Sequence, residues 1–398
     1  MKKIKAITSR RRQYLNSFYC HHFVKNVCAM GGLSLHIIIS IKFMFFYLFY
    51  FPSMECTPRP SSLAFRPLCL SLWGNDVMMK TVTLNETNME MPMVGLGTWQ
   101  AKPEEIEDAV NNALDLGYRL IDTAFNYNNE DVIGRVLTSW LDQKKGERSE
   151  LFITTKLPHI ANRAQDVERF LRLSLIKLNL SYVDLYLIHV PFGFENDEKT
   201  MTPRVKENGE FELDWTTDHI SLWKAMEAVK EQGLTKNIGL SNFNEQQIEA
   251  IYSIASVKPQ VLQVECHIYL QQAGLREYCK NKNIVLTAYS PLGSPGAQLQ
   301  NCPDLIGHPK VKDIAAKLGV TPSQVLLKYL VIHNIVVIPK SSNPERLKKN
   351  IDLFSFELSA EDVLTLKLLD QGEGGRIIDF MFWKGVQNHP KYPFPIKA

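Results

Sequence analysis

The chain has 398 residues, enough for one large core, and it carries 45 Lys and Arg residues against 42 Asp and Glu residues, a net charge of +3. The charge is uneven, because residues 1–77 hold 10 basic and 2 acidic residues, whereas residues 78–398 hold 35 basic and 40 acidic residues. A mildly acidic body gives no electrostatic reason to bind nucleic acid, and we exclude that class of partner.

The cysteines divide the chain in the same place, with four in the first part and three in the body. Cys266, Cys279 and Cys302 show no CxxC spacing, so they predict neither a metal site nor a disulfide framework. We therefore expect a cytoplasmic protein without a metal ion, and we expect a monomer.

Residues 1–77 form a basic and apolar N-terminal extension. Residues 35–51 are long enough for a signal anchor, but Lys42 near their centre opposes insertion by about 3 kcal/mol, and a lumenal body conflicts with the cysteine pattern. Met78 and Met79 directly precede residues that begin like a domain. We expect an artefactual or disordered extension, and a membrane anchor at 35–51 is the alternative.

The body, residues 78–398, begins with a predicted hairpin over 82–94 that turns at 85–88. Strands and helices then alternate. Predicted strands cover 94–99, 120–122, 151–156, 183–189, 237–242, 261–265, 284–290 and 336–341, and predicted helices cover 104–116, 130–141, 164–178, 220–232, 245–255, 273–281, 311–318, 323–333, 344–353 and 360–369.

Eight strand and helix units without a second core predict an α/β fold, a (β/α)8 TIM barrel with the N-terminal hairpin as a plug. A polar insertion at 192–217 is long enough to be a functional loop. The stretch Gly95-Leu96-Gly97 lacks the third glycine of a dinucleotide-binding turn, so a Rossmann domain is disfavoured.

Polar side chains stand where three successive strands end. The stretch 117–130 contains Asp122 and Tyr127, the next strand ends at Lys156, and the one after it ends at His189. Parallel barrels place their chemistry at the carboxyl ends of the strands, so these four side chains are expected to meet at one rim.

The body resembles the aldo-keto reductase family from about residue 79 to residue 395. Eight motifs carry the resemblance: Gly95–Trp99, Ile121-Asp122 with Tyr127 and Asn129-Glu130, Thr155–Leu157, Leu187–His189, Ile238–Phe243, Gln263–His267, Tyr289–Ser294, and Pro339–Ser341 with Arg346 and Asn350. The family has a (β/α)8 barrel that uses NADPH without a Rossmann fold, and its members of the aldose reductase type reduce aldehydes and ketones.

The resemblance implies a catalytic role for four residues. Tyr127 is expected to be the general acid that protonates the carbonyl oxygen, and the ammonium of Lys156 is expected to lower the pKa of that phenol. Asp122 is expected to keep Lys156 charged, and His189 to orient the carbonyl group. The expected substrate contacts are Trp99, Tyr127, His189 and Val190.

The resemblance also implies an NADPH or NADP⁺ site. Ser241, Asn242 and Gln263 suit a carboxamide, Tyr289 can stack on the nicotinamide, and Lys340 with Arg346 suits a 2′-phosphate, which favours NADPH over NADH. The complete expected set is Thr98, Trp99, Asp122, Ser241, Asn242, Gln263, Tyr289, Ser290, Leu292, Ser294, Lys340, Ser341, Arg346 and Asn350. Lys349 departs from the family pattern beside the adenine position.

Three further departures surround the substrate pocket: Pro158, Val190 and Ile268 replace common Trp, Trp and Pro residues. A pocket wall with fewer aromatic side chains implies a roomier or differently shaped site. Residues 376–393 are expected to fold across the mouth of this pocket. His189 argues against relatives that reduce steroid carbon–carbon double bonds. The alternative function is a cofactor-binding regulatory or structural module without turnover.

Overall fold

The computed structural model describes residues 80–296 and 302–396. The extension over 1–77 and its apolar run at 35–51 lie outside these residues. Within the described ranges, no helix combines the length and the apolar character needed to cross a membrane.

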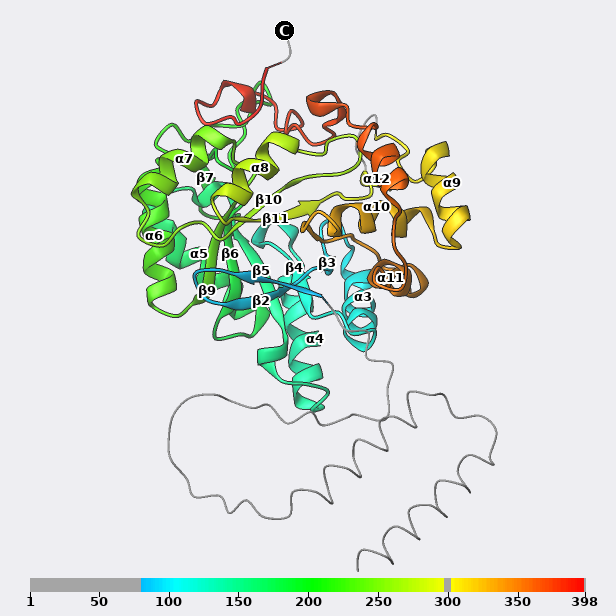
Figure 1. Cartoon of the computed structure of the whole chain (residues 1–398). Coiled ribbons are helices and arrows are strands. Elements are labelled where there is room, and N and C mark those ends of the chain that lie inside the picture. The colour runs from blue at the N-terminus through cyan, green and yellow to red at the C-terminus, as the bar shows by residue number, and fades with distance from the viewer. Residues whose placement is uncertain (1–79, 297–301, 397–398) are drawn as a thin grey trace, which may run out of the picture. The chain divides into compact units, whose positions relative to one another are not determined.

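Eight parallel strands form the barrel in the order β3-β4-β5-β6-β9-β10-β11-β12 (Figure 1). Two isolated parallel bridges, Val94 with Val337 and Gly97 with Lys340, join the first and last strands. This architecture confirms the predicted (β/α)8 barrel. The strands are β3 Gly95–Gly97, β4 Leu120–Asp122, β5 Phe152–Leu157, β6 Val183–Ile188, β9 Thr235–Ser241, β10 Val261–Glu265, β11 Val285–Tyr289 and β12 Val336–Val337.

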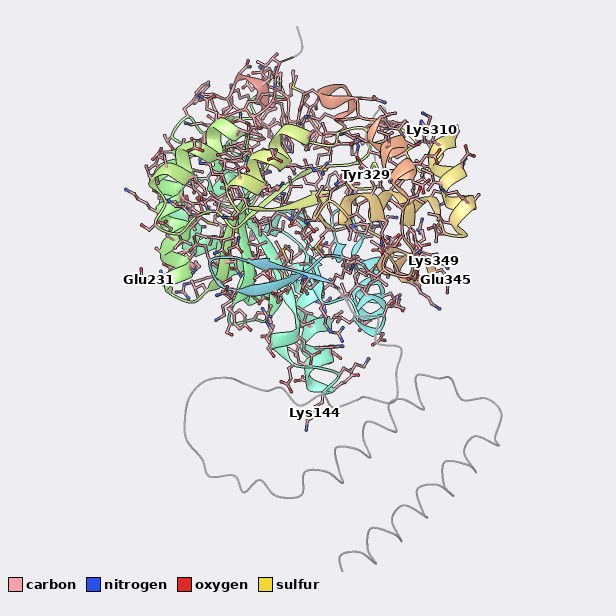
Figure 2. The ribbon with its side chains drawn as sticks, viewed as in Figure 1. Lys144, Glu231, Lys310, Tyr329, Glu345 and Lys349 are labelled. Atoms are coloured by element: carbon pink, nitrogen blue, oxygen red, sulfur yellow. The ribbon has the colours of Figure 1, made fainter. Side chains whose placement is uncertain are left out.

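Helices surround the strands in Figure 1. The charged side chains labelled in Figure 2 are exposed and lie on these helices or beside them. Tyr329, labelled in the same figure, is buried. The helices are α3 Pro103–Asp115, α4 Glu130–Asp142, α5 Val167–Leu178, α6 His219–Glu231, α7 Glu245–Ile254, α8 Ala273–Asn281, α9 Pro309–Leu318, α10 Pro322–Val331, α11 Pro344–Ile351 and α12 Ala360–Lys367. Several of these helices begin at a capping side chain; for example, Asn244 and Gln247 form a reciprocal capping box at α7.

Several predicted elements are shorter than expected, including the first strand, which was predicted over 94–99 and covers Gly95–Gly97. The helix predicted over 164–178 begins with a separate 3-10 turn, η4 (Ala164–Asp166), before α5. The last strand, predicted over 336–341, is reduced to the two residues of β12. Pro339 has no N–H to donate and interrupts the ladder, although its carbonyl still accepts a bond from the Gly97 N–H at 3.2 Å.

The predicted hairpin pairs β1 (Thr81–Leu84) with β2 (Met89–Pro92) and turns through Asn88, which has a φ of 52°. The Thr87 hydroxyl donates to Asn237 Oδ1 at 2.7 Å, near the start of β9. The hairpin therefore covers the amino ends of the strands, below the barrel in Figure 1.

The carboxyl ends carry the longest loop and the C-terminal segment. The loop over 192–217 contains the two-residue strands β7 (Asn196–Asp197) and β8 (Thr202–Pro203). Its aromatic rings pack on the C-terminal segment, with ring centroids 5.5 Å apart for Phe192 and Phe380 and 5.4 Å apart for Phe194 and Trp383. In Figure 1 this red segment lies at the end of the barrel opposite the hairpin.

Candidate active site

Lys156 lies at the centre of a buried polar cluster at the carboxyl ends of β4, β5 and β6. Its Nζ donates to Asp122 Oδ1 at 2.6 Å, to the Thr123 carbonyl at 2.9 Å and to the Tyr127 hydroxyl at 3.2 Å. The three N–H groups of the ammonium thus have three acceptors. The neighbouring strand ends bring these side chains together because β4, β5 and β6 are adjacent and parallel.

Both carboxylate oxygens of Asp122 accept hydrogen bonds. Its Oδ2 accepts a bond from Gln263 Nε2 at 2.7 Å, across the barrel from β10. The Thr98 hydroxyl donates to the Asp122 backbone carbonyl at 2.9 Å. Lys156 is 0% and Asp122 3% exposed, so this ion pair is shielded from solvent and screened little by salt.

Tyr127 ends the 3-10 turn η1 (Phe125–Tyr127), and Asn128 behind it adopts a left-handed φ of 54°. The buried Asn129 fixes this turn, because its Nδ2 donates to the Thr98 carbonyl at 2.9 Å and its Oδ1 accepts from the Thr123 hydroxyl at 2.9 Å. Asn129 belongs to a recognised motif, yet its supporting role was not predicted. The signal available was its position, two residues after the tyrosine.

His189 follows β6 and faces the same tyrosine. The two rings meet edge to face, with centroids 5.6 Å apart. The His189 backbone carbonyl accepts from Asn242 Nδ2 at 2.9 Å, which fixes the chain at this strand end.

Burial dominates the electrostatics of the cluster. It raises the pKa of Tyr127 well above its usual value, and the Asp122 charge raises it further. Burial also lowers the pKa of Lys156, while Asp122 raises it. The expectation that Tyr127 has a lowered pKa is therefore wrong, because burial and the Asp122 charge both favour the neutral phenol.

The same burial sets the state of the histidine. Loss of solvation, followed by repulsion from Lys156, lowers the pKa of His189 well below its usual value. His189 is thus a neutral imidazole at neutral pH, able to donate one hydrogen bond without carrying charge.

The cluster suits proton delivery to a developing alkoxide. A half-buried phenol with a raised pKa keeps its proton until a stronger base forms beside it, and an alkoxide is a stronger base than a phenolate. The Lys156 ammonium already donates to the phenol oxygen, so it stabilises the phenolate that remains after transfer. A reduced nicotinamide supplies hydride in such chemistry.

The carboxyl ends of β9, β10 and β11 offer polar groups that suit a nicotinamide carboxamide. Asn242, with a left-handed φ of 65°, has its amide bonded to Ser241, to the His189 carbonyl and, at 2.8 Å, to the Tyr289 hydroxyl. Among the described residues, the Ser241 hydroxyl proton and Gln263 Oε1 enter no hydrogen bond. One donor and one acceptor are thus free for an amide, so the residues fit the group.

The loop after β11 has the backbone conformation of a close-contact loop. Ser290 and Ser294 have φ values of 49° and 53°, and their hydroxyls bond to each other at 2.7 Å. Left-handed non-glycine residues are uncommon and concentrate at ligand sites. Leu292 lies half-buried between them.

Four further expected residues lie in α11 or shortly before it. Lys340 and Arg346 are exposed, whereas Ser341 and Asn350 are buried. Ser341 Oγ accepts from the Asn343 N–H at 3.2 Å, and Lys340 Nζ lies 3.6 Å from Glu105 Oε2. Two exposed cations at the N-terminus of a helix can hold a phosphate. Lys349 points to solvent on the same helix.

The expected substrate wall is apolar. Val190 is buried and Trp99 is half-buried beside β3. His159, directly after Pro158, packs edge to face on Trp383 at 4.7 Å, so the C-terminal segment supplies an aromatic ring beside a position where the family often has one. Glu265 secures that segment, because its oxygens accept from the N–H groups of residues 377 and 378, each at 2.8 Å.

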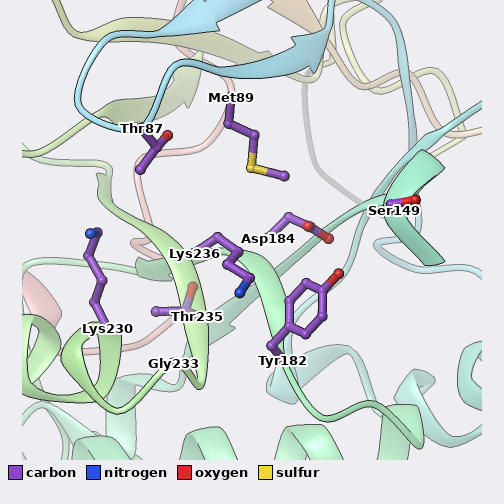
Figure 3. A pocket seen from close by; sticks show the side chains of 9 residues that line it. All are labelled: Thr87, Met89, Ser149, Tyr182, Asp184, Lys230, Gly233, Thr235 and Lys236. Carbon is purple, nitrogen blue, oxygen red and sulfur yellow. The ribbon is translucent and has the colours of Figure 1, made fainter. Parts of the chain in front are cut away.

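A cavity of about 540 Å³ lies at the other end of the barrel (Figure 3). It is lined by Thr87 of the hairpin turn, by Tyr182 and Asp184 at the start of β6, and by Lys236 of β9, whose ammonium lies 4.5 Å from the centre of the Tyr182 ring. The Lys156 cluster is at the opposite strand ends, so this cavity is separate from the candidate active site.

Comparison with known proteins agrees with the geometry. Residues 93–371 match the model of the Aldo/keto reductase family. The chain is 42% identical over 325 residues to aldo-keto reductase family 1 member A1-A of Danio rerio, covering 80% of this chain and 99% of that protein, and 39% identical over 326 residues to member A1 of Homo sapiens, with the same coverage. The solved structure of an aldose reductase from Schistosoma japonicum is similar with a TM-score of 0.73 and 35% identity, covering 80% of this chain and 100% of that one.

Proposed function

Because this chain belongs to the aldo/keto reductase family, we propose that it reduces aldehydes and ketones to alcohols with NADPH, with Tyr127 as the general acid. Family membership supports an oxidoreductase that acts on carbonyl groups. The choice of cofactor and the role of each residue are the proposal.

One observation carries this function: the Tyr127 hydroxyl lies 3.2 Å from Lys156 Nζ, which in turn lies 2.6 Å from Asp122 Oδ1. A proton donor, a cation that stabilises its conjugate base and a carboxylate that keeps the cation charged are the parts that carbonyl protonation requires. The neutral His189 ring beside Tyr127 supports a further hydrogen bond to the carbonyl oxygen.

NADPH is proposed over NADH because Lys340 and Arg346 are both exposed near the start of α11. A 2′-phosphate carries two negative charges and is bound better by two cations than a hydroxyl group is. We also propose that the protein is a monomer and that it works in the cytoplasm.

The test uses the full chain, with NADPH and NADH compared against a panel of aromatic and aliphatic aldehydes and ketones. NADPH should be oxidised in the presence of the carbonyl compound, and Tyr127→Phe should lower kcat by at least about 100-fold while cofactor binding, followed by quenching of tryptophan fluorescence, is kept. The matched control is Tyr278→Phe, which removes a phenol that bonds to Glu249 on the outer surface.

Two results would contradict the proposal. Full activity of Tyr127→Phe would remove the phenol from the mechanism. Tight NADPH binding by the wild-type chain without turnover of any carbonyl compound would support a regulatory or structural module instead.

A further inference from the structure

Glu130 is a buried carboxylate that the proposed reaction does not use. It is the first residue of α4 and is 1% exposed. Its Oε1 accepts a hydrogen bond from the Thr155 hydroxyl at 2.6 Å, whereas its Oε2 has no hydrogen-bond partner among the described residues. A buried carboxylate with one bare oxygen is costly unless nearby cations compensate its charge.

Glu130 lies behind the strand that carries the catalytic lysine. Thr155 and Lys156 are consecutive residues of β5, so their side chains point to opposite faces of the barrel wall. Lys156 points inward to Asp122, and Thr155 therefore points outward to the helices, where Glu130 meets it. Tyr186 pairs with Thr155 in the register of β5 and β6 and shares that outer face.

Charged and titratable side chains from β5, α5 and β6 surround the Glu130 carboxylate. Lys156 of β5 and Lys177 of α5 are the nearby cations, and both lower the pKa of Glu130 against the larger effect of burial, which raises it. The Thr155 hydroxyl, through its hydrogen bond, and the nearby Ser174 hydroxyl lower that pKa too. Tyr186 contributes an uncharged phenol, because burial and Glu130 itself raise its pKa well above the usual value.

We propose that Glu130 is a positioning residue that acts on Lys156 through the barrel wall, as a second carboxylate that keeps the lysine in its ammonium form. Asp122 supplies the direct ion pair and Glu130 supplies attraction from behind. Tyr127 and His189, which also face Lys156, are uncharged before proton transfer, so the two carboxylates are the only negative charges among the described groups that act on it. This inference rests on the proposed role of Lys156 beside Tyr127.

The test compares Glu130→Gln with Asp131→Asn in the full chain. The glutamine can still accept the Thr155 hydrogen bond but has no charge, whereas Asp131→Asn removes the same charge from the next residue, which is exposed and pairs with Arg135 at 3.3 Å. The first readout is the dependence of kcat on pH, and the second, which needs no cofactor, is the titration of Lys156 by NMR of ¹³C-labelled lysine, assigned with Lys156→Met.

In Glu130→Gln, Lys156 should lose its proton at lower pH than in the wild type, and the ratio of kcat at about pH 9 to kcat at about pH 7 should fall by about threefold or more. Asp131→Asn should leave both readouts unchanged. The inference fails if Glu130→Gln only lowers stability and both readouts match the wild type. Absence of turnover in the wild type contradicts the proposed function instead, and the NMR titration still decides whether Glu130 acts on Lys156.

Discussion

Lys156 makes hydrogen bonds with all three of its ammonium protons, and one of the acceptors, Asp122, carries a full negative charge. Burial lowers the pKa of this lysine, and Asp122 is the largest influence that raises it again. The charge of Asp122 is therefore the largest influence that keeps a cation beside the phenol of Tyr127. A single oxygen-to-nitrogen replacement tests that dependence.

Asp122→Asn should lower kcat by at least about 100-fold, because Lys156 sheds its proton and no longer stabilises the phenolate. The free energy of unfolding should fall by about 3 kcal/mol, since one partner of a buried ion pair is removed. Steady-state turnover and urea unfolding of the full chain measure the two effects. The control, Asp115→Asn, removes the carboxylate of an exposed pair with Lys145 at 3.2 Å and should change stability by less than about 1 kcal/mol. A kcat near the wild-type value in Asp122→Asn would contradict this role.

Among the elements, α4 comes next after η1 and begins at Glu130, so its position fixes both. Helix α4 lies very close to α5. Gly134 of α4 faces the last turn of α5. A Cβ built at Gly134 would lie 2.3 Å from the Lys177 carbonyl oxygen and 2.8 Å from Leu178 Cα. These are backbone atoms, which cannot move aside as a flexible side chain can, so the contact between the two helices requires glycine.

Gly134→Ala should therefore lower the free energy of unfolding by about 2 kcal/mol, although alanine favours a helix over glycine by about 1 kcal/mol. Gly274→Ala in α8 is the matched control. Its Cβ would have only Glu245 Oε1 nearby, at 3.7 Å, so helix propensity should prevail and stability should rise by up to about 1 kcal/mol. Urea unfolding of both variants measures the difference, and equal changes of one sign would refute the packing argument.

The elements also show which features a sequence can predict. An apolar run that ends in Asp122, Lys156 or His189 is a local pattern, and adjacent parallel strands then bring the side chains together. The hydrogen bonds from residues 377 and 378 to Glu265 join parts of the chain more than 100 residues apart, and no local pattern indicates them. The raised pKa of Tyr127 depends on burial by the whole site, so residue types and spacing predicted the wrong direction.

For the whole molecule, buried neutral imidazoles link stability to acid. Burial lowers the pKa of His159 to about 3 and the pKa of His219 to about 4. Both values lie below the pKa of about 6.5 of an unfolded histidine. The unfolded chain therefore binds protons that the folded chain excludes as the pH falls below about 6.5, and the free energy of unfolding must decrease in that direction.

Each of these two imidazoles should lower the free energy of unfolding by about 2 kcal/mol between about pH 6.5 and about pH 5. His159→Phe tests one of them, because a phenyl ring can keep the edge-to-face packing with Phe194 and Trp383 but cannot take up a proton. Urea unfolding of wild type and variant at both pH values should show a decrease with acid that is smaller by about 2 kcal/mol in the variant. Carboxylates titrate equally in both proteins, so they cancel in this difference. An identical decrease in wild type and variant would mean that His159 takes up its proton in the folded barrel. In that case the close packing of the 192–217 loop on the C-terminal segment does not exclude charge from this end of the molecule.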